Sequence, residues 1–176
     1  MNLIPIVTED VLRARVKEIG AQITRDSAGD SLLVVSVLKG SFIFLADLVR
    51  EIRLPQKIDF LKVSSYGAAG TVPSGQVRFE LDMSLDPAGQ HVLLVEDIVD
   101  SGVTAGKVLD LLAARKPASL RAVTLLCKSH ADPAIRDRFK YVGFTIGPEF
   151  VVGYGLDYAE RYRERRDLCI LQGTAN

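Results

Sequence analysis

The chain has 176 residues, of which 48% are apolar, and this suits one compact domain with a sizeable core. Lysine plus arginine equals aspartate plus glutamate at 22 each, so the chain has no overall basic field that would attract nucleic acid. No apolar run approaches the roughly 20 residues that span a bilayer, and "MNLIPIVTED" lacks the basic and apolar segments of a signal peptide. We therefore expect a cytoplasmic protein without a membrane partner.

The first third of the chain alternates between helix and strand patterns. Residues 8–25 repeat apolar side chains on one helical face, and Thr8 is placed to cap this helix. The run "SLLVVSVL" (31–38) is almost continuously apolar, as in a strand that is buried on both faces of a parallel sheet. A glycine turn and a helix are expected over 39–52, and a second strand over 56–66.

Residues 67–76, "GAAGTVPSGQ", interrupt this alternation with three glycines, one proline and little apolar surface. The composition predicts a loop, and the alternating segment "VRFELDM" that follows it predicts a strand. A loop of this length is typical of a lid over a site, but it also occurs as a hairpin tip without function. Composition alone leaves both interpretations open.

The rest of the chain continues the alternation of buried strands with helices, which predicts an α/β fold with a mostly parallel central sheet flanked by helices. A helix is expected over 103–115, after a strand over 90–97. The expected strands are 90–97, 119–128 and 140–146, followed by short strands within 149–158 and 168–173.

The stretch "VLLVEDIVDSGVTAGK" (92–107) concentrates groups that carry chemistry. A buried strand ends at Glu96 and Asp97, Asp100 follows, and residues 101–104 lead into a helix. Ligands of parallel α/β sheets bind at the carboxyl ends of strands. A helix N-terminus there offers free backbone N–H groups, and the serine and threonine add hydroxyl donors. Everything after Asp100 therefore favours an anion, most simply a phosphate.

The acids would repel a phosphate, so we expect them to face another part of the same ligand. Carboxylates accept hydrogen bonds from sugar hydroxyls and favour a nearby Mg²⁺. A ribose 5-phosphate that carries a pyrophosphate combines all these groups. A Walker A loop is excluded because only three residues separate Gly102 from Gly106, where that motif needs four, and GxGxxG is absent from this turn. A capped helix with solvated acids remains the alternative without function.

This stretch resembles the phosphoribosyl pyrophosphate (PRPP) signature of type I phosphoribosyltransferases. The segments "LKGSFIFLADLVR", "SSYG", "LLCK" and "EFVVGYGLDYAERYR" resemble those of hypoxanthine-guanine phosphoribosyltransferases, in the same order, over about residues 30–165. The resemblance implies the type I fold with a small hood formed by the chain ends, one domain over 1–176 and a lid over about 66–77. It also implies purine salvage, in which PRPP and hypoxanthine or guanine give IMP or GMP and pyrophosphate, with Mg²⁺ as cofactor.

The resemblance assigns roles on the ribose side by position. Asp100 is expected to act as general acid/base beside N7 of the purine. Glu96 and Asp97 are expected to hold the ribose hydroxyls and, through them, Mg²⁺. The 5′-phosphate is expected to bind the backbone and hydroxyls of Ser101, Gly102, Val103 and Thr104.

The resemblance also assigns pyrophosphate, lid and base contacts. Lys39, Gly40 and Arg163 are expected to meet pyrophosphate, and the Leu38–Lys39 bond can adopt the cis form in this family. Ser65 and Tyr66 match the base of the lid. Lys128 is expected to donate to the purine 6-oxo group, Phe150 to stack on the purine, and Val151 to read it through its backbone. Asp157 is expected to bind a second Mg²⁺ near the base.

One segment departs from the family pattern, because Gly147-Pro148 stands where relatives often have Pro-Asp. This departure leaves the preference among bases open, and a phosphoribosyltransferase for another base, such as xanthine or adenine, remains an alternative. A related regulator that binds nucleotide and RNA without turnover is a second alternative, although the balanced charge argues against it. Because family members commonly form dimers or tetramers, we expect a homodimer or homotetramer.

Overall fold

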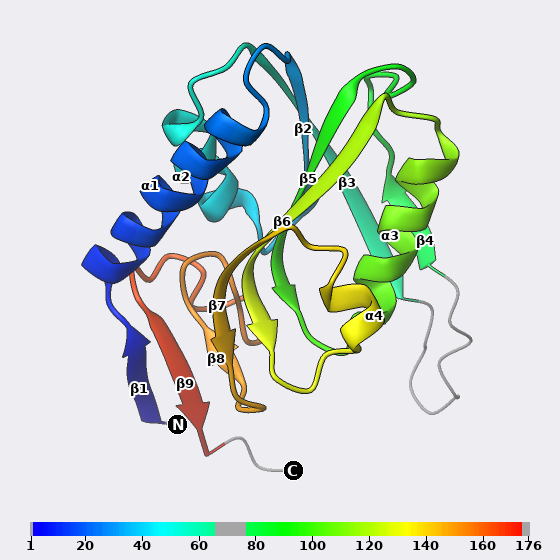
Figure 1. Cartoon of the computed structure of the whole chain (residues 1–176). Helices are drawn as coiled ribbons and strands as arrows, with labels where there is room; N and C mark the ends of the chain where they lie inside the picture. The colour runs from blue at the N-terminus through cyan, green and yellow to red at the C-terminus, as the bar shows by residue number, and fades with distance from the viewer. Residues whose placement is uncertain (1, 66–76, 174–176) are drawn as a thin grey trace.

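The computed structural model describes residues 2–65 and 77–173, and its larger sheet has six strands in the order β4-β3-β2-β5-β6-β7 (Figure 1). All neighbouring strands pair in parallel except β4, which runs antiparallel to β3 at one edge. The mostly parallel α/β sheet predicted from the sequence is therefore confirmed. The strands are β2 (Leu32–Leu38), β3 (Gln56–Ser65), β4 (Val77–Leu81), β5 (His91–Val99), β6 (Ser119–Lys128) and β7 (Tyr141–Ile146).

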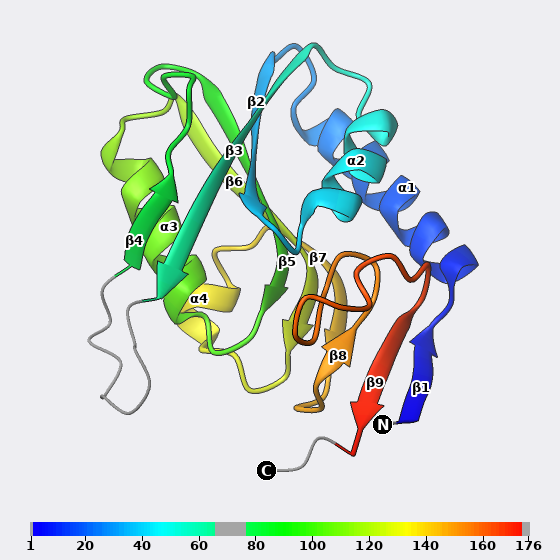
Figure 2. The same ribbon diagram turned by 180° about the vertical axis from the view of Figure 1, so that it is seen from behind.

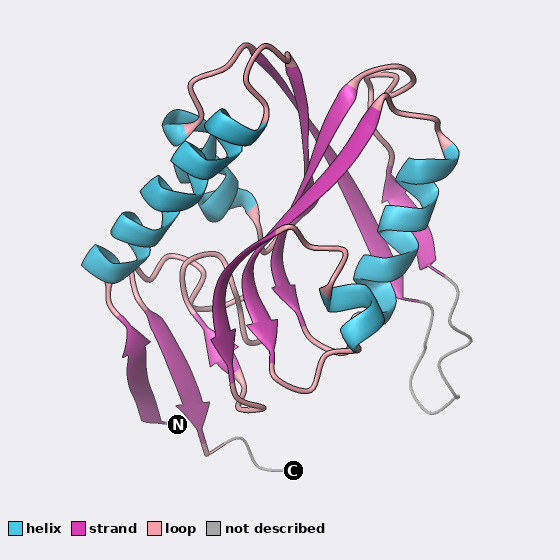
Figure 3. Ribbon diagram, viewed as in Figure 1, coloured by secondary structure: helices cyan, strands magenta, loops and turns pink. Residues whose placement is uncertain are grey.

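Helices cover both faces of this sheet (Figure 3). One face carries α1 (Glu9–Asp26) and α2 (Phe42–Glu51), and the other carries α3 (Val103–Ala114) and α4 (Pro133–Arg136). Successive side chains of a strand point to opposite faces, so β2 divides its apolar residues between two cores. Leu32 and Val34 pack with α1 and α2, whereas Leu33 and Val35 pack with α3. The continuous apolar run of β2 is therefore needed because both faces of this strand are covered by helices.

A second sheet of three antiparallel strands joins the two ends of the chain in the order β1-β9-β8 (Figure 2). These strands are β1 (Asn2–Val7), β8 (Val151–Val152) and β9 (Leu168–Gln172). The ribbon views place this small sheet beside the carboxyl ends of β5, β6 and β7. The chain ends therefore form the expected hood, and it lies over the edge where the candidate site residues leave the sheet.

The structure corrects several boundaries. The strand predicted within 149–158 is limited to Val151–Val152, because Gly153, Tyr154 and Gly155 have φ of 103°, 50° and 103° and turn the chain. The glycine turn and helix predicted over 39–52 are confirmed, with the helix running from Phe42 to Glu51. Thr8 takes the N-cap position of α1, but its side chain makes no capping hydrogen bond.

Two elements of the structure, β1 and α4, were not predicted from the sequence. The strand β1, "NLIPIV", lacks regular alternation and contains a proline, and its pairing with β9 shifts register between Pro5 and Val7. The helix α4 has only four residues, although Asp132 accepts a hydrogen bond from Ala134 N and Pro133 occupies its first turn. No helix within the described residues combines the length and apolar character needed to cross a membrane.

Candidate active site

The candidate site lies at the carboxyl edge of the large sheet, where β2 and β5 end beside each other. Their parallel pairing runs up to Ser36 and Val95, so the segments that continue from these residues share one edge. Six residues predicted from the sequence line one cavity of about 320 Å³ at this edge. They are Lys39, Gly40, Glu96, Asp97, Asp157 and Arg163. The fold thus joins residues from three distant parts of the chain.

Close backbone packing fixes the floor of this cavity. A Cβ atom on Gly40 would lie only 1.5 Å from Asp97 Oδ2, so the carboxylate occupies the space that glycine leaves. A Cβ on Gly155 would lie 2.1 Å from the carbonyl oxygen of Gly40, and Gly155 also has a φ of 103°. The Leu38–Lys39 peptide bond is cis, as the family resemblance implies. The loop after β2 is therefore held between the acids of β5 and the hood.

The two adjacent acids of the cavity are poorly compensated by the protein. Glu96 is only 5% exposed, and burial, together with the charge of Asp97, raises its pKa well above its usual range. Burial also raises the pKa of Asp97 to about 6, although a 2.7 Å hydrogen bond from Ile98 N and the charge of Arg163 oppose this rise. Such carboxylates favour a ligand that brings a cation or hydrogen-bond donors.

Two acids of the hood loop, the segment 153–167 that connects β8 to β9, hold the basic side chains of the cavity. Arg163 Nη2 lies 2.8 Å from Asp157 Oδ1 and 3.3 Å from Glu160 Oε2. Lys39 Nζ lies 3.0 Å from the same Glu160 oxygen, so Glu160 joins the two cations that were predicted to meet pyrophosphate. Hydrogen bonds from Lys39 and Arg163 lower the pKa of Glu160.

Sequence reasoning missed two charged residues that line this cavity, Glu160 and Lys62. Lys62 lies on β3 and pairs with Glu80 of β4. Glu160 belongs to the matched segment "EFVVGYGLDYAERYR", but its charge resembles that of an ordinary solvated run. Only the fold shows that it faces Lys39 across the cavity.

The turn after β5 presents the N-terminus of α3. Gly102 is the N-cap of α3 and has a left-handed φ of 94°, which glycine adopts without strain. The first hydrogen bond within α3 runs from Gly106 N to Gly102 O at 2.8 Å. Val103 N makes only a 3.4 Å contact with Ser101 Oγ, and both residues are exposed. The turn over 101–104 therefore has the geometry of an anion site, with donors on an accessible helix start.

The groups predicted to meet the base lie at the neighbouring strand end. Val99 of β5 pairs with Cys127 of β6, so Asp100 and Lys128 leave the sheet side by side. Lys128 is 4% exposed and donates from Nζ to the carbonyl oxygen of Glu149. Burial lowers the pKa of Lys128, whereas the charges of Asp100 and Glu149 oppose this change.

The remaining predicted residues are placed as follows. Phe150 is 50% exposed and meets Tyr158 edge-on, with ring centroids 5.8 Å apart, whereas Val151 is buried in β8. Of the residues predicted to lie near the base, Asp157 lines the 320 Å³ cavity, whereas Lys128, Phe150 and Val151 do not, so the site consists of two adjoining parts. Ser65 ends β3, and Tyr66 with most of the predicted lid lies outside the described residues.

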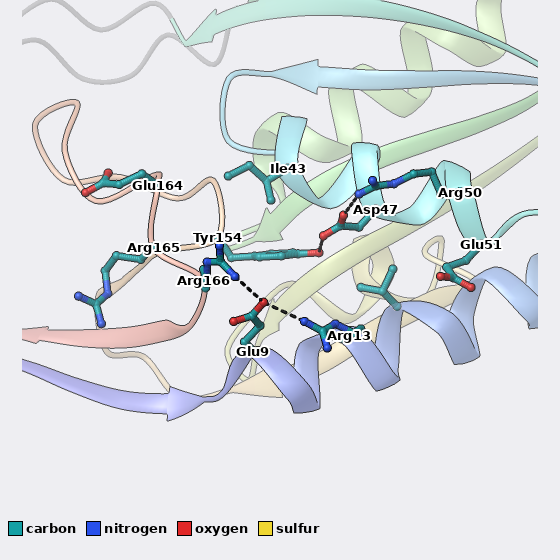
Figure 4. A pocket seen from close by; sticks show the side chains of 11 residues that line it. Glu9, Arg13, Ile43, Asp47, Arg50, Glu51, Tyr154, Glu164, Arg165 and Arg166 are labelled. Atoms are coloured by element: carbon teal, nitrogen blue, oxygen red, sulfur yellow. Dashed lines mark hydrogen bonds and ion pairs between the residues drawn. The ribbon is translucent and has the colours of Figure 1, made fainter.

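A larger cavity of about 550 Å³ lies between α1, α2 and the hood loop, away from these acids (Figure 4). Its charged groups are largely paired with one another. Tyr154 donates to Asp47 Oδ2 at 2.6 Å, and Glu9 Oε1 accepts from Arg13 at 2.9 Å and from Arg166 at 3.2 Å. These contacts connect the hood to the helices, so we place the candidate active site in the smaller cavity.

Comparisons with known proteins identify the family to which this fold belongs. Residues 8–159 match the family model described as phosphoribosyl transferase domain. The chain is 48% identical to the hypoxanthine phosphoribosyltransferase of Haemophilus influenzae, over 90% of this chain and 89% of the relative. It is 48% identical to the hypoxanthine-guanine phosphoribosyltransferase of Mycobacterium avium, over 90% and 80% of the two chains. A Trypanosoma cruzi hypoxanthine phosphoribosyltransferase structure superposes with a TM-score of 0.88 at 41% identity, covering 96% of this chain and 94% of that one.

Proposed function

The chain belongs to the hypoxanthine phosphoribosyltransferase family, and from this premise we propose that it transfers the 5-phosphoribosyl group of PRPP to hypoxanthine or guanine. The products are IMP or GMP and pyrophosphate, and the reaction serves purine salvage. The observation that carries the proposal is that buried Glu96 and partly buried Asp97 line one cavity together with Lys39 and Arg163. In this proposal residues 1–176 act as one domain in the cytoplasm.

Different groups of the site bind different parts of PRPP. Glu96 and Asp97 accept hydrogen bonds from the two ribose hydroxyls. These hydrogen bonds offset the free-energy cost of burying the carboxylates. The 5′-phosphate lies on residues 101–104, where the exposed start of α3 and the Ser101 and Thr104 hydroxyls donate hydrogen bonds. Lys39, Gly40 and Arg163, which line the same cavity, receive the pyrophosphate.

The donor set at the acids fits Mg²⁺, because this ion prefers oxygen ligands and is commonly bound through one or two carboxylates together with substrate phosphates. Glu96, Asp97 and Asp157 would hold it, partly through ribose hydroxyls or water. Within the described residues no three His, Cys, Asp or Glu side chains form a ready metal cluster, so PRPP itself would supply further ligands. The bound ion would neutralise the negative charge of the departing pyrophosphate.

The protein groups then position and shield the reaction. The bond from C1 of the ribose to pyrophosphate breaks as N9 of the purine forms its bond to C1, and positive charge develops on the sugar ring. Asp100 accepts the proton of N7 as N9 bonds to C1, so the purine leaves the reaction without a positive charge. Lys128, fixed by the Glu149 carbonyl, donates to the 6-oxo group, and Phe150 provides a face for stacking.

The function is tested by incubating the protein with PRPP, Mg²⁺ and each of hypoxanthine, guanine, xanthine and adenine. We expect nucleoside 5′-monophosphate and pyrophosphate with hypoxanthine or guanine. Turnover with xanthine or adenine alone would replace the substrate assignment. Lack of turnover with every base, combined with binding of RNA in a gel shift, would instead favour a regulatory protein.

Lys128→Ala should weaken the selection of 6-oxopurines. The ratio of kcat/KM for hypoxanthine to that for a purine without the 6-oxo group should fall by about tenfold or more, because a hydrogen bond to a charged donor contributes about 1.5–3 kcal/mol. Lys107→Ala is a suitable control, since Lys107 lies on α3 away from the base-side groups. An unaltered ratio in Lys128→Ala would remove the proposed contact.

The proposal includes association of the protein into homodimers or homotetramers. Phe42 is 43% exposed at the start of α2, where contact with another copy would bury it.

A further inference from the structure

The side chain of His130, to which no role has been assigned so far, contacts Asp100, the proposed general acid/base. His130 Nε2 is 2.9 Å from Asp100 Oδ1, and the two residues belong to the turns that follow β6 and β5. An ionised carboxylate only accepts hydrogen bonds, so the imidazole donates its Nε2–H to Asp100. Neither the acid-rich pattern of the sequence nor its family segments select His130, which follows Lys128 by two residues.

The turn that carries His130 is itself anchored on both sides. Asp132 N donates to the carbonyl oxygen of Ser101 at 3.2 Å, which ties this turn to the one after Asp100. Ser129 N donates to the carbonyl oxygen of Ile146 at 2.8 Å, which ties it to the end of β7. The backbone on either side of His130 is thus held, and its side chain reaches Asp100 from a fixed base.

Asp100 needs such support because 68% of its side chain is exposed. An exposed aspartate samples several rotamers, whereas proton transfer requires one orientation toward the base. A hydrogen bond on Oδ1 fixes the carboxylate plane and leaves Oδ2 available to the purine. Lys128 also faces Asp100, but its Nζ is engaged by the Glu149 carbonyl, so it acts on Asp100 through charge.

We propose that His130 is a positioning residue, which orients the Asp100 carboxylate for proton exchange with the purine. This inference rests on the proposed function, since it assumes that Asp100 exchanges a proton with N7. His130 holds one carboxylate oxygen throughout the reaction and does not itself touch the base.

The test uses the whole protein with saturating PRPP, Mg²⁺ and hypoxanthine under single-turnover conditions, because product release often limits kcat. His130→Ala should slow the single-turnover step by about three- to tenfold, the scale of a partly exposed hydrogen bond to a charged group. PRPP affinity should stay within about twofold. His130→Gln, whose amide can also donate, should recover most of the rate, and Ser129→Ala should match the wild type.

A double-mutant cycle with Asp100→Asn separates positioning from a general structural role. If His130 acts through Asp100, then adding His130→Ala to Asp100→Asn should slow the reaction no further. Independent losses that multiply, or a wild-type rate in His130→Ala, would overturn the inference while leaving the proposed function intact. Failure of the wild-type protein to turn over any base would instead overturn the proposed function, and the positioning role with it.

Discussion

Asp100→Asn should slow the formation of IMP by about 10²–10⁴-fold, the usual contribution of a positioned general acid/base. The amide keeps the shape of the carboxylate and can still accept a hydrogen bond from His130, but it cannot take a proton. PRPP binding should change little, because Asp100 does not line the 320 Å³ cavity that is proposed to receive the ribose and the pyrophosphate. Single-turnover rates and calorimetric titration with PRPP at millimolar Mg²⁺ measure the two effects separately.

Asp10→Asn is the matched control for this substitution. Its side chain is 93% exposed on α1 and does not line the site cavity, so this substitution removes the same charge without touching the site. The control should retain the wild-type rate. An unchanged single-turnover rate in Asp100→Asn would remove Asp100 from the chemistry, and a comparable loss in both variants would assign the effect to net charge.

Asp97→Asn should make the ligand-free protein more stable at neutral pH while weakening PRPP binding by tenfold or more. Burial raises the pKa of Asp97 from 3.8 to about 6, so between these values the folded protein holds a proton that the unfolded chain releases. The stability associated with the protonated carboxyl is present below pH 3.8 and is lost as the pH rises through 6. At neutral pH the ionised Asp97 therefore lowers the free energy of unfolding, and the amide removes this cost.

The expected gain is about 1–2 kcal/mol, less than the full equivalent of the pKa shift because Asp97 is only partly buried. Thermal unfolding in the presence of a chelator should show a midpoint about 2–6 °C higher for Asp97→Asn at pH 7.5, and the difference should shrink near pH 4. Asn can still accept the hydrogen bond from Ile98 N, which limits other changes. Asp110→Asn, on an exposed part of α3, is the control.

A lower midpoint for Asp97→Asn at pH 7.5 would contradict the view that this carboxylate is held at a cost. PRPP affinity equal to that of the wild type, measured at millimolar Mg²⁺, would contradict its role at the ribose. The two measurements are independent, since one is made without ligand and the other with it. A stability gain combined with a binding loss would show that the acid is retained for its ligand.

The sequence by itself determined the layered sheet and the chemistry of the turn after β5. Both are local patterns, since a strand covered on two faces must be apolar at successive positions, as Leu32 to Val35 are. The acids and small residues from Glu96 to Thr104 likewise follow one strand directly, so their place at the carboxyl edge follows from the parallel topology. The segments that resemble the family identified site residues in distant parts of the chain, such as Lys39 and Arg163, but not the contacts between these residues.

Only the tertiary structure decided how Glu160 joins Lys39 to Arg163 and how His130 reaches Asp100. Tertiary structure also decided β1, because this strand forms only by pairing with β9 at the far end of the chain. It likewise decided the short extent of β8, because backbone turns directly after Val152 end this strand. Periodicity describes which face of an element is apolar, whereas these contacts depend on where separate turns meet. Their geometry is set by the packing of the whole chain.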